Sequence, residues 1–292
     1  EVLARIGRLE LRARMVVEGI ITGLHKSPYH GAAVEFADHR AYVAGDDPRH
    51  IDWKVYGRLG RFVIKKFEEE TNLRAHIVLD CSESMRFGHD GRLSKYDYGG
   101  TLAASLAYLL NRQLDSVGLT LFDSKIQKQV PPSTGKNILS LIGEIMQSVE
   151  PAEKTGLDGV FSELAESLPR RGLVIVISDL FAPREEIASG LQAFSLRGHD
   201  VIVFHVLDET ELTFPFEGNT LFKGLEDYPE INADPRQLQE AYVEVFEEYL
   251  QEIERIASTG GFDYQRSLTS DPLDAAVVSL IAARAKLRRL RR

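Results

Sequence analysis

The stretch Ala75-His-Ile-Val-Leu-Asp-Cys-Ser-Glu-Ser-Met85 joins an apolar strand to a run of oxygen-bearing side chains. Its apolar part ends in Asp80, and Ser82 and Ser84 follow at alternate positions. Strands that are buried on both faces of a parallel sheet read as continuous runs of Val, Ile and Leu. Ligands bind outside the carboxyl ends of such strands, where the strand order reverses. The stretch therefore predicts a buried parallel strand that delivers Asp80 to the rim of a sheet.

Two further oxygen donors lie downstream of this strand. Asp179 ends a second apolar strand, Leu173 to Ser178, and Thr155 lies in a loop between two predicted helices. Oxygen donors without sulfur or imidazole suit a hard divalent cation such as Mg²⁺, which keeps an open position for a partner's carboxylate. The predicted metal ligands are Asp80, Ser82, Ser84, Thr155 and Asp179. The Asp-x-Ser-x-Ser pattern is also ordinary loop and helix-cap chemistry, so an empty, hydrogen-bonded site of the same residues is the alternative.

Strand and helix patterns alternate along the central part of the chain. This alternation predicts an α/β fold with a doubly wound, mostly parallel sheet. The expected parallel strands are 74–80, 117–122, 172–178, 200–206 and 262–267, with 125–130 antiparallel. The expected helices are 94–114, 136–149, 158–168, 184–196 and 235–258, and a last helix follows Pro272 to about residue 287. Alternating apolar residues with Pro and Gly near 208–233 suggest short strands or an excursion from the sheet.

The first 70 residues read as an N-terminal extension, followed by the main domain at 71–292. Residues 1–25 carry an amphipathic helical pattern, and 61–70 read as a strand that forms a hairpin with 74–80. The extension has too little apolar content for a core of its own, so we expect it to pack on the main domain.

The segment Gly45-Asp-Asp-Pro-Arg-His-Ile-Asp-Trp53 is the centre of this extension. An Asp before Pro48 is typical of a capped helix start, which would place Trp53 in the core. Its density of charge also suits a buried polar network or a partner surface. That candidate surface comprises Arg40, Asp46, Asp47, Arg49, Asp52 and Trp53.

Composition narrows the function classes. The chain has 292 residues, 43% of them hydrophobic, which is typical of a soluble globular protein. Its net charge of −9 argues against nucleic acid as the main partner. Its one cysteine, Cys81, fits a reducing compartment, so we expect a cytoplasmic location. No apolar run is long enough to span a bilayer, so membrane association would involve the termini, such as the cationic end 284–292. The chain begins at Glu1, which leaves an upstream anchor open.

Several enzyme signatures are absent from the sequence. It has no phosphate-binding Gly-x-x-x-x-Gly-Lys-[Ser/Thr] loop, no Gly-x-Ser-x-Gly elbow and no His-Glu-x-x-His pair. A metal-dependent phosphoester hydrolase would use the cation as a Lewis acid, but it also needs a positioned nucleophile and an acid or base. We therefore expect a non-enzymatic protein-interaction module, with such a hydrolase or a structural domain with an empty site as alternatives.

The segment from Gly31 through Met85 resembles the family known as domain of unknown function 58. The resemblance rests on Glu35-Phe36, Arg40-Ala-Tyr42, the Gly45–Trp53 segment, the basic strand from Val63 and Asp80-Cys-Ser-Glu-Ser-Met85. The later region is similar to a von Willebrand factor A domain, whose metal-ion-dependent adhesion site uses Asp-x-Ser-x-Ser, a Thr and an Asp. The resemblance implies a partner among MoxR-type AAA+ ATPases or their client proteins, in a chaperone-like assembly.

Overall fold

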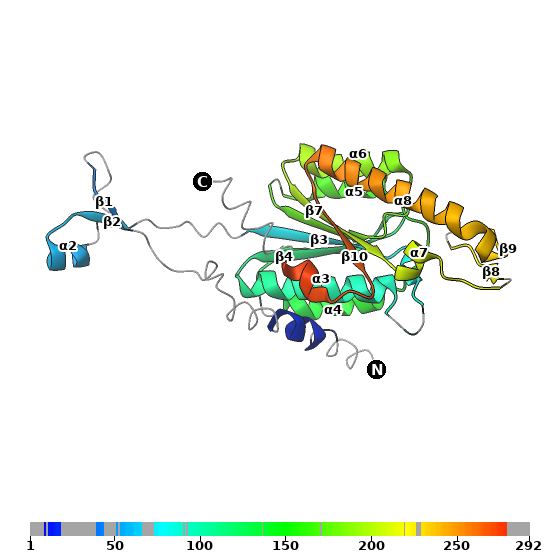
Figure 1. The fold of residues 1–292 in the computed structure, drawn as a ribbon. Coiled ribbons are helices and arrows are strands. Elements are labelled where there is room, and N and C mark those ends of the chain that lie inside the picture. The colour runs from blue at the N-terminus through cyan, green and yellow to red at the C-terminus, as the bar shows by residue number, and fades with distance from the viewer. Residues whose placement is uncertain are drawn as a thin grey trace. The chain divides into compact units, whose positions relative to one another are not determined.

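The computed structural model describes residues 9, 11–18, 39–43, 51, 53–65, 73–89, 91, 93–135, 137–169, 171–218, 220–225 and 229–278. The chain divides into two compact units (Figure 1). The sheet unit comprises Glu1–Ile21 and Leu73–Arg292, and the N-terminal unit comprises Thr22–Asn72. The predicted boundary at residue 70 falls close to the second junction, but the first helix groups with the sheet. The packing of the N-terminal unit on the sheet unit stays a prediction.

The sheet unit is built on six strands in the order β10-β7-β6-β3-β4-β5. All neighbouring pairs are parallel except β4 with β5. The predicted doubly wound, mostly parallel α/β fold is therefore confirmed, including the one antiparallel strand. The strands are β3 (Arg74–Asp80), β4 (Ser116–Phe122), β5 (Ile126–Ser133), β6 (Leu173–Ser178), β7 (Asp200–Leu207) and β10 (Asp263–Leu268).

The strand order reverses at β3. From β3 the chain builds β4 and β5 on one side, and then returns to place β6 and β7 on the other side. β3 and β6 pair in register, with Leu79 opposite Ile177, so the residues that follow them emerge side by side. Asp80 and Asp179 therefore lie at the point where doubly wound sheets bind ligands.

Helices cover both faces of the sheet (Figure 1). The core on one face combines α3 and α4 with residues of the first helix, such as Val17, and the core on the other face combines α5, α6 and α8. None of the helices in the described part of the chain combines the length and apolarity that crossing a bilayer requires. The helices are α3 (Lys95–Arg112), α4 (Ile138–Ser148), α5 (Leu157–Ser167), α6 (Arg184–Leu196) and α8 (Pro235–Gly260).

Local sequence signals set the ends of these helices. The Asp234 side chain accepts a hydrogen bond from the Arg236 N–H and caps α8, with Pro235 in its first turn. Gly261 ends α8 in the left-handed conformation, with a φ of 72°. Residues 273–278 are helical, and the rest of the predicted last helix lies outside the described residues.

An excursion separates β7 from α8. It contains α7 (Glu209–Thr213) and an antiparallel hairpin of β8 (Thr220–Phe222) and β9 (Ile231–Ala233). Stacked aromatic rings join it to α8, an arrangement that we call the aromatic ladder. Neighbouring rings lie 4.4 to 6.2 Å apart between centroids. In order, the ladder comprises Phe222, Phe214, Tyr242, Phe246 and Tyr249.

The prediction of a hairpin between 61–70 and 74–80 is wrong. β2 (Val63–Lys65) pairs with β1 (His39–Ala41) inside the N-terminal unit, in antiparallel register. β3 carries parallel partners on both sides, β4 and β6, along nearly its whole length. A central strand has both of its edges paired, so none is left for a hairpin partner. Alternating apolar residues indicate a strand but do not reveal which strand it will pair with.

The N-terminal unit presents aromatic side chains around α2 (Trp53–Leu59). Trp53 is 60% exposed, so it does not lie in a core as its position in the motif suggested. Tyr56 stacks on Phe62 with ring centroids 4.4 Å apart, and Trp53 contacts both rings edge-on. The side chain of Arg40 and the residues Asp46, Asp47, Arg49 and Asp52 lie outside the described residues.

Gly118 allows β5 to close on β4. A Cβ atom at Gly118 would lie 2.5 Å from His76 Nδ1 and 2.8 Å from the Val130 carbonyl oxygen. We expect Gly118→Ala to lower the free energy of unfolding by about 1–3 kcal/mol, because the backbone of β5 must move. Gly159→Ala is the matched control, since nothing lies within 4 Å of a Cβ there and the site is helical. It should stabilise by up to about 1 kcal/mol. Urea unfolding of both variants tests this, and equal stability would contradict it.

Candidate cation site at the carboxyl edge of the sheet

Asp80 is fully buried at the end of β3. It ends at the carboxyl edge of the sheet, as expected, but the expectation that it lies on an open rim outside the core is wrong, because the loops after β3 and β6 close over the strand ends. Its carboxylate accepts hydrogen bonds from Ser82 and Ser178, including one from the Ser82 side chain. The Ser82 N–H donates to Oδ1 at 2.9 Å, and the Ser178 hydroxyl donates to Oδ2 at 2.5 Å. Asp80 thereby ties the end of β3 to the end of β6.

The two serines connect Asp80 to Asp179. The hydroxyls of Ser82 and Ser84 lie 3.0 Å apart, and Ser84 hydrogen-bonds the Asp179 side chain. Asp179 Oδ1 also accepts from the Phe181 N–H at 3.2 Å. Four of the five predicted ligands, Asp80, Ser82, Ser84 and Asp179, thus form one buried hydrogen-bonded cluster.

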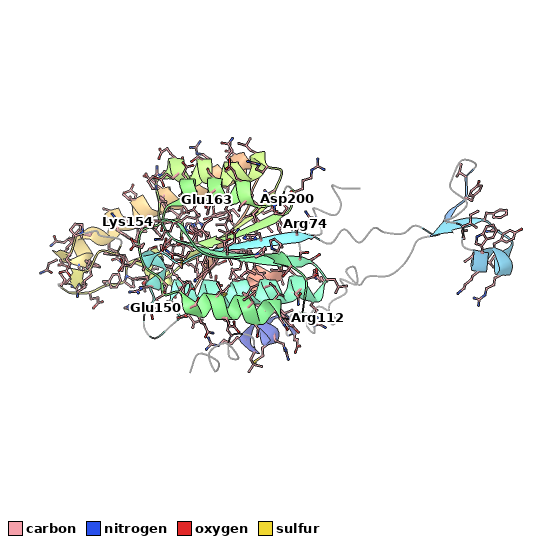
Figure 2. All side chains as sticks on the ribbon, turned by 180° about the vertical axis from the view of Figure 1, so that it is seen from behind. Arg74, Arg112, Glu150, Lys154, Glu163 and Asp200 are labelled. Atoms are coloured by element: carbon pink, nitrogen blue, oxygen red, sulfur yellow. The ribbon has the colours of Figure 1, made fainter. Side chains whose placement is uncertain are left out.

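The loop that carries Thr155 lies against this cluster. The Glu83 N–H donates to the Glu153 carbonyl at 2.9 Å, and the Ala152 N–H donates to the Cys81 carbonyl at 3.1 Å. Thr155 itself is half-buried in this loop. Glu150 and Lys154 in Figure 2 mark the same end of the sheet, opposite Arg74 and Asp200 at the starts of β3 and β7. The role of Thr155 as a ligand stays a prediction.

A buried lysine completes the cluster. Lys95, in the first turn of α3, is 3% exposed and donates to Asp179 Oδ2 and to Glu211 Oε1, each at 2.7 Å. Glu211 lies on α7, where its carboxylate also accepts from the Asp208 N–H at 2.7 Å and completes a capping box. The cluster therefore joins β3, β6, α3 and α7.

The two aspartates have opposite pKa shifts. Burial, with the nearby Asp179 charge, raises the pKa of Asp80 to about 7, although hydrogen bonds from Ser178 and Ser82 oppose the shift. Burial would also raise the pKa of Asp179, but the Lys95 ammonium outweighs it and holds that pKa below its ordinary value. Burial raises the pKa of Glu211 despite the same ammonium. The negative charge of the cluster is therefore only partly balanced.

The backbone after β6 is fixed from two sides. His205 Nε2 lies 2.8 Å from the Asp179 carbonyl oxygen, and Nδ1 lies 2.7 Å from the Tyr264 hydroxyl. Burial lowers the pKa of His205 to about 4, so the ring is neutral at pH 7. A carbonyl can only accept, so Nε2 carries the proton and Nδ1 accepts from Tyr264. The Tyr249 hydroxyl donates to the Leu180 carbonyl, which connects the aromatic ladder to the same loop.

The donor set fits a hard divalent cation in chemical type. No group of three or more His, Cys, Asp or Glu side chains in the described ranges is arranged to hold a metal ion, so a cation here would depend on the serine hydroxyls. Asp179 and Glu211 share the Lys95 ammonium, and the hydrogen bonds that Asp80 accepts among the described residues come from neutral serine groups, so two negative charges are uncompensated within the cluster when all three carboxylates are ionised. A divalent cation would balance that charge if Lys95 gave up its place on Asp179.

The sequence did not single out Lys95, Ser178 or Glu211. The position of Lys95 could have indicated a buried ion pair. A cation in the first turn of a helix is disfavoured by the macrodipole, so a compensating contact elsewhere is expected. Glu211 follows Asp208 at capping-box spacing, which predicts a helix start but not a contact with α3. Cys81 donates to the Phe122 carbonyl, and burial raises the pKa of its thiol, so its described surroundings do not favour a nucleophilic thiolate.

The raised pKa of Asp80 predicts that the free energy of unfolding depends on pH. Its folded-state pKa of about 7 lies above the ordinary value of 3.8, so the folded protein binds more protons between these values. The free energy of unfolding should fall as pH rises through this window, by at most about 4 kcal/mol, and level off above it. The stabilising effect of Asp179 is lost only at lower pH, as pH falls through its lowered pKa.

Urea unfolding of the wild type and Asp80→Asn in chelator, across this pH range, measures the effect. The Asn variant should lack the decline with rising pH. Parallel stability curves for the two proteins would rule out Asp80 as its source.

The residue range from 38 to 249 matches the model of a family described as protein of unknown function DUF58. Uncharacterized proteins of Mycobacterium tuberculosis and Mycobacterium bovis are each 26% identical over 238 residues, which cover 80% of this chain and 74% of each relative.

The solved structures that this chain resembles include BatB and a VWA domain. BatB from Bacteroides thetaiotaomicron is 20% identical with a TM-score of 0.49, over 73% of this chain and 99% of that one. The VWA domain of SpRpn10 is 12% identical with a TM-score of 0.38, over 70% of this chain and 94% of that one. The family match spans most of the chain, from β1 to near the end of the aromatic ladder, and on this basis the chain belongs to the DUF58 family.

Proposed function

We propose that this chain is a protein-interaction module that binds an acidic group of a partner through a divalent cation at the carboxyl edge of the sheet. The observation that carries the proposal is the buried cluster of oxygen donors at the strand-order reversal, whose three carboxylates are accompanied by one ammonium, that of Lys95. The cation, Mg²⁺ in the first instance, would be held by Asp80, Ser82, Ser84, Thr155 and Asp179. It would supply a coordination position for a carboxylate of the partner.

The charge of the whole chain supports a role for the cation. With a net charge of −9, the protein repels an acidic partner, and a bound cation would provide the local attraction. The adjacent surface offers apolar contact as well, since Phe181, two residues after Asp179, is 47% exposed. A carboxylate with a neighbouring apolar side chain is therefore the feature that this edge would recognise.

The exposed aromatic rings of the N-terminal unit are a candidate for a second contact. Trp53 and Tyr56 are exposed, and Lys54, Arg58 and Arg61 lie on or beside α2. Tyr, Trp and Arg are the side chains that most often dominate binding energy at interfaces. The resemblance described above suggests the partner, a MoxR-type AAA+ ATPase or its client protein.

The proposal predicts metal-dependent association. Affinity for a MoxR-type ATPase purified from the same source should fall at least about tenfold when excess EDTA replaces Mg²⁺. Asp80→Asn and Asp179→Ala should weaken binding in Mg²⁺ and remove its response to EDTA. Biolayer interferometry or calorimetry measures the effect, with thermal unfolding as the check that each variant is folded.

Glu150→Gln is the matched control for this experiment. Glu150 lies at the same end of the sheet and is exposed, so the substitution removes one negative charge without touching the cluster. It should bind like the wild type in Mg²⁺. Equal affinity of the wild type in Mg²⁺ and in excess chelator would exclude the metal-bridged contact.

A further inference from the structure

The Lys95 ammonium lies where a counter-ion for Asp179 is needed. It bridges carboxylates from two elements far apart in the chain, Asp179 after β6 and Glu211 on α7, at 2.7 Å each. It also lies 5.7 Å from the centroid of the Phe87 ring. Lysines are almost never fully buried unless they are paired, and here both pairing groups are themselves largely enclosed. Lys95 is therefore the cation of this cluster as the structure presents it.

The position of Lys95 on its helix has no local benefit. The first turn of α3 carries the positive end of the helix dipole, which disfavours a cation. Ser94 already caps the helix by accepting from the Asp97 N–H. The contacts with Asp179 and Glu211 must compensate for both burial and the dipole, so the ammonium serves those carboxylates and not α3.

The ammonium and a divalent cation would compete for Asp179. Its Oδ2 accepts from Lys95 and its Oδ1 accepts from the Phe181 N–H, so both oxygens are engaged. Two cations within a few ångströms of each other in a water-poor site repel strongly. Lys95 must therefore leave Asp179 before this carboxylate can ligate a divalent cation.

We propose that Lys95 is a resident cation that keeps the site closed, and that its departure from Asp179 also releases Glu211 and loosens α7. This inference deepens the proposed function, because it rests on a divalent cation using the same carboxylate. α7 is the part of the excursion that the release would affect directly. Glu211 closes its capping box, and its last residue, Thr213, accepts from the Gln239 side chain of α8 at 2.9 Å.

Removal of the ammonium should strengthen cation binding. Lys95→Met and Lys95→Gln take away the competitor and leave the five predicted ligands intact. We expect each variant to bind Mn²⁺ at least about tenfold more tightly than the wild type in calorimetric titrations. Without metal, their melting temperatures should be lower, since two buried carboxylates lose their partner, and Mn²⁺ should restore more stability to them than to the wild type.

Lys125→Met is the matched control. Lys125 follows β4 at the same edge of the sheet, and its side chain is exposed. Its substitution by Met therefore changes the net charge by the same amount as Lys95→Met but leaves the cluster intact. Its Mn²⁺ affinity should stay within about twofold of the wild type. Variants at residue 95 that bind Mn²⁺ no more tightly than this control would overturn the inference.

Hydrogen exchange of the wild type gives a readout that does not depend on a substitution. Saturating Mn²⁺ should speed exchange of the α7 amides, residues 209–213, because Glu211 loses Lys95. Unchanged exchange there at saturation would contradict the link to α7, even if the residue 95 variants fail to fold. These measurements use no partner protein. If partner binding fails while the residue 95 variants bind Mn²⁺ more tightly, the role of Lys95 stands and the proposed partner contact does not.

Discussion

The in-register parallel pairing of β3 with β6 is the constraint on which the site depends. Each strand ends in a polar residue, and the pairing places Asp80 beside Ser178, whose hydroxyl donates to it. If the register slipped by one residue, the side chains of one strand would move to the opposite face. The hydrogen bond between Asp80 and Ser178 would then be lost, together with the approach of Asp179 to the serines of the loop.

Burial makes the same residue types behave differently within a few ångströms. Burial raises the pKa of Asp80, whose hydrogen-bond donors among the described residues are neutral, whereas the Lys95 ammonium lowers the pKa of Asp179. A buried charge is tolerated only where partners replace its lost hydration. The cluster as a whole has more carboxylates than cationic partners. In a surface ion pair such as Arg255 with Glu252, water can solvate the charges, so an excess of one sign matters less there.

The sequence predicted those features that depend on local pattern. Continuous apolar runs identified β3, β4, β6 and β7, since burial on both faces leaves no room for polar residues. The same runs placed Asp80 and Asp179 at one edge, because the carboxyl ends of parallel strands share an edge. Helix ends were predicted to within two residues at α6 and α8 by their flanking residues.

Features that depend on long-range pairing were not predicted. The strand β2 joins β1 and not β3, and Lys95 reaches carboxylates 84 and 116 residues away. Neither the strand pairing nor the ion pairing can be read from the residues that are near in sequence. The burial of Asp80 depends on how closely two loops approach each other, which a strand-end pattern does not specify.

The excursion has an evolutionary consequence. Its hairpin, β8 with β9, hydrogen-bonds only within itself among the described strands, so the central sheet does not depend on it for pairing. Surface segments of this kind vary in length and sequence more readily than the elements they connect. The aromatic ladder nevertheless joins one end of the excursion to α8, whose Tyr249 hydroxyl donates to the Leu180 carbonyl. A change in the length or sequence of the hairpin therefore need not alter the pairing of the central sheet or the strand-end cluster.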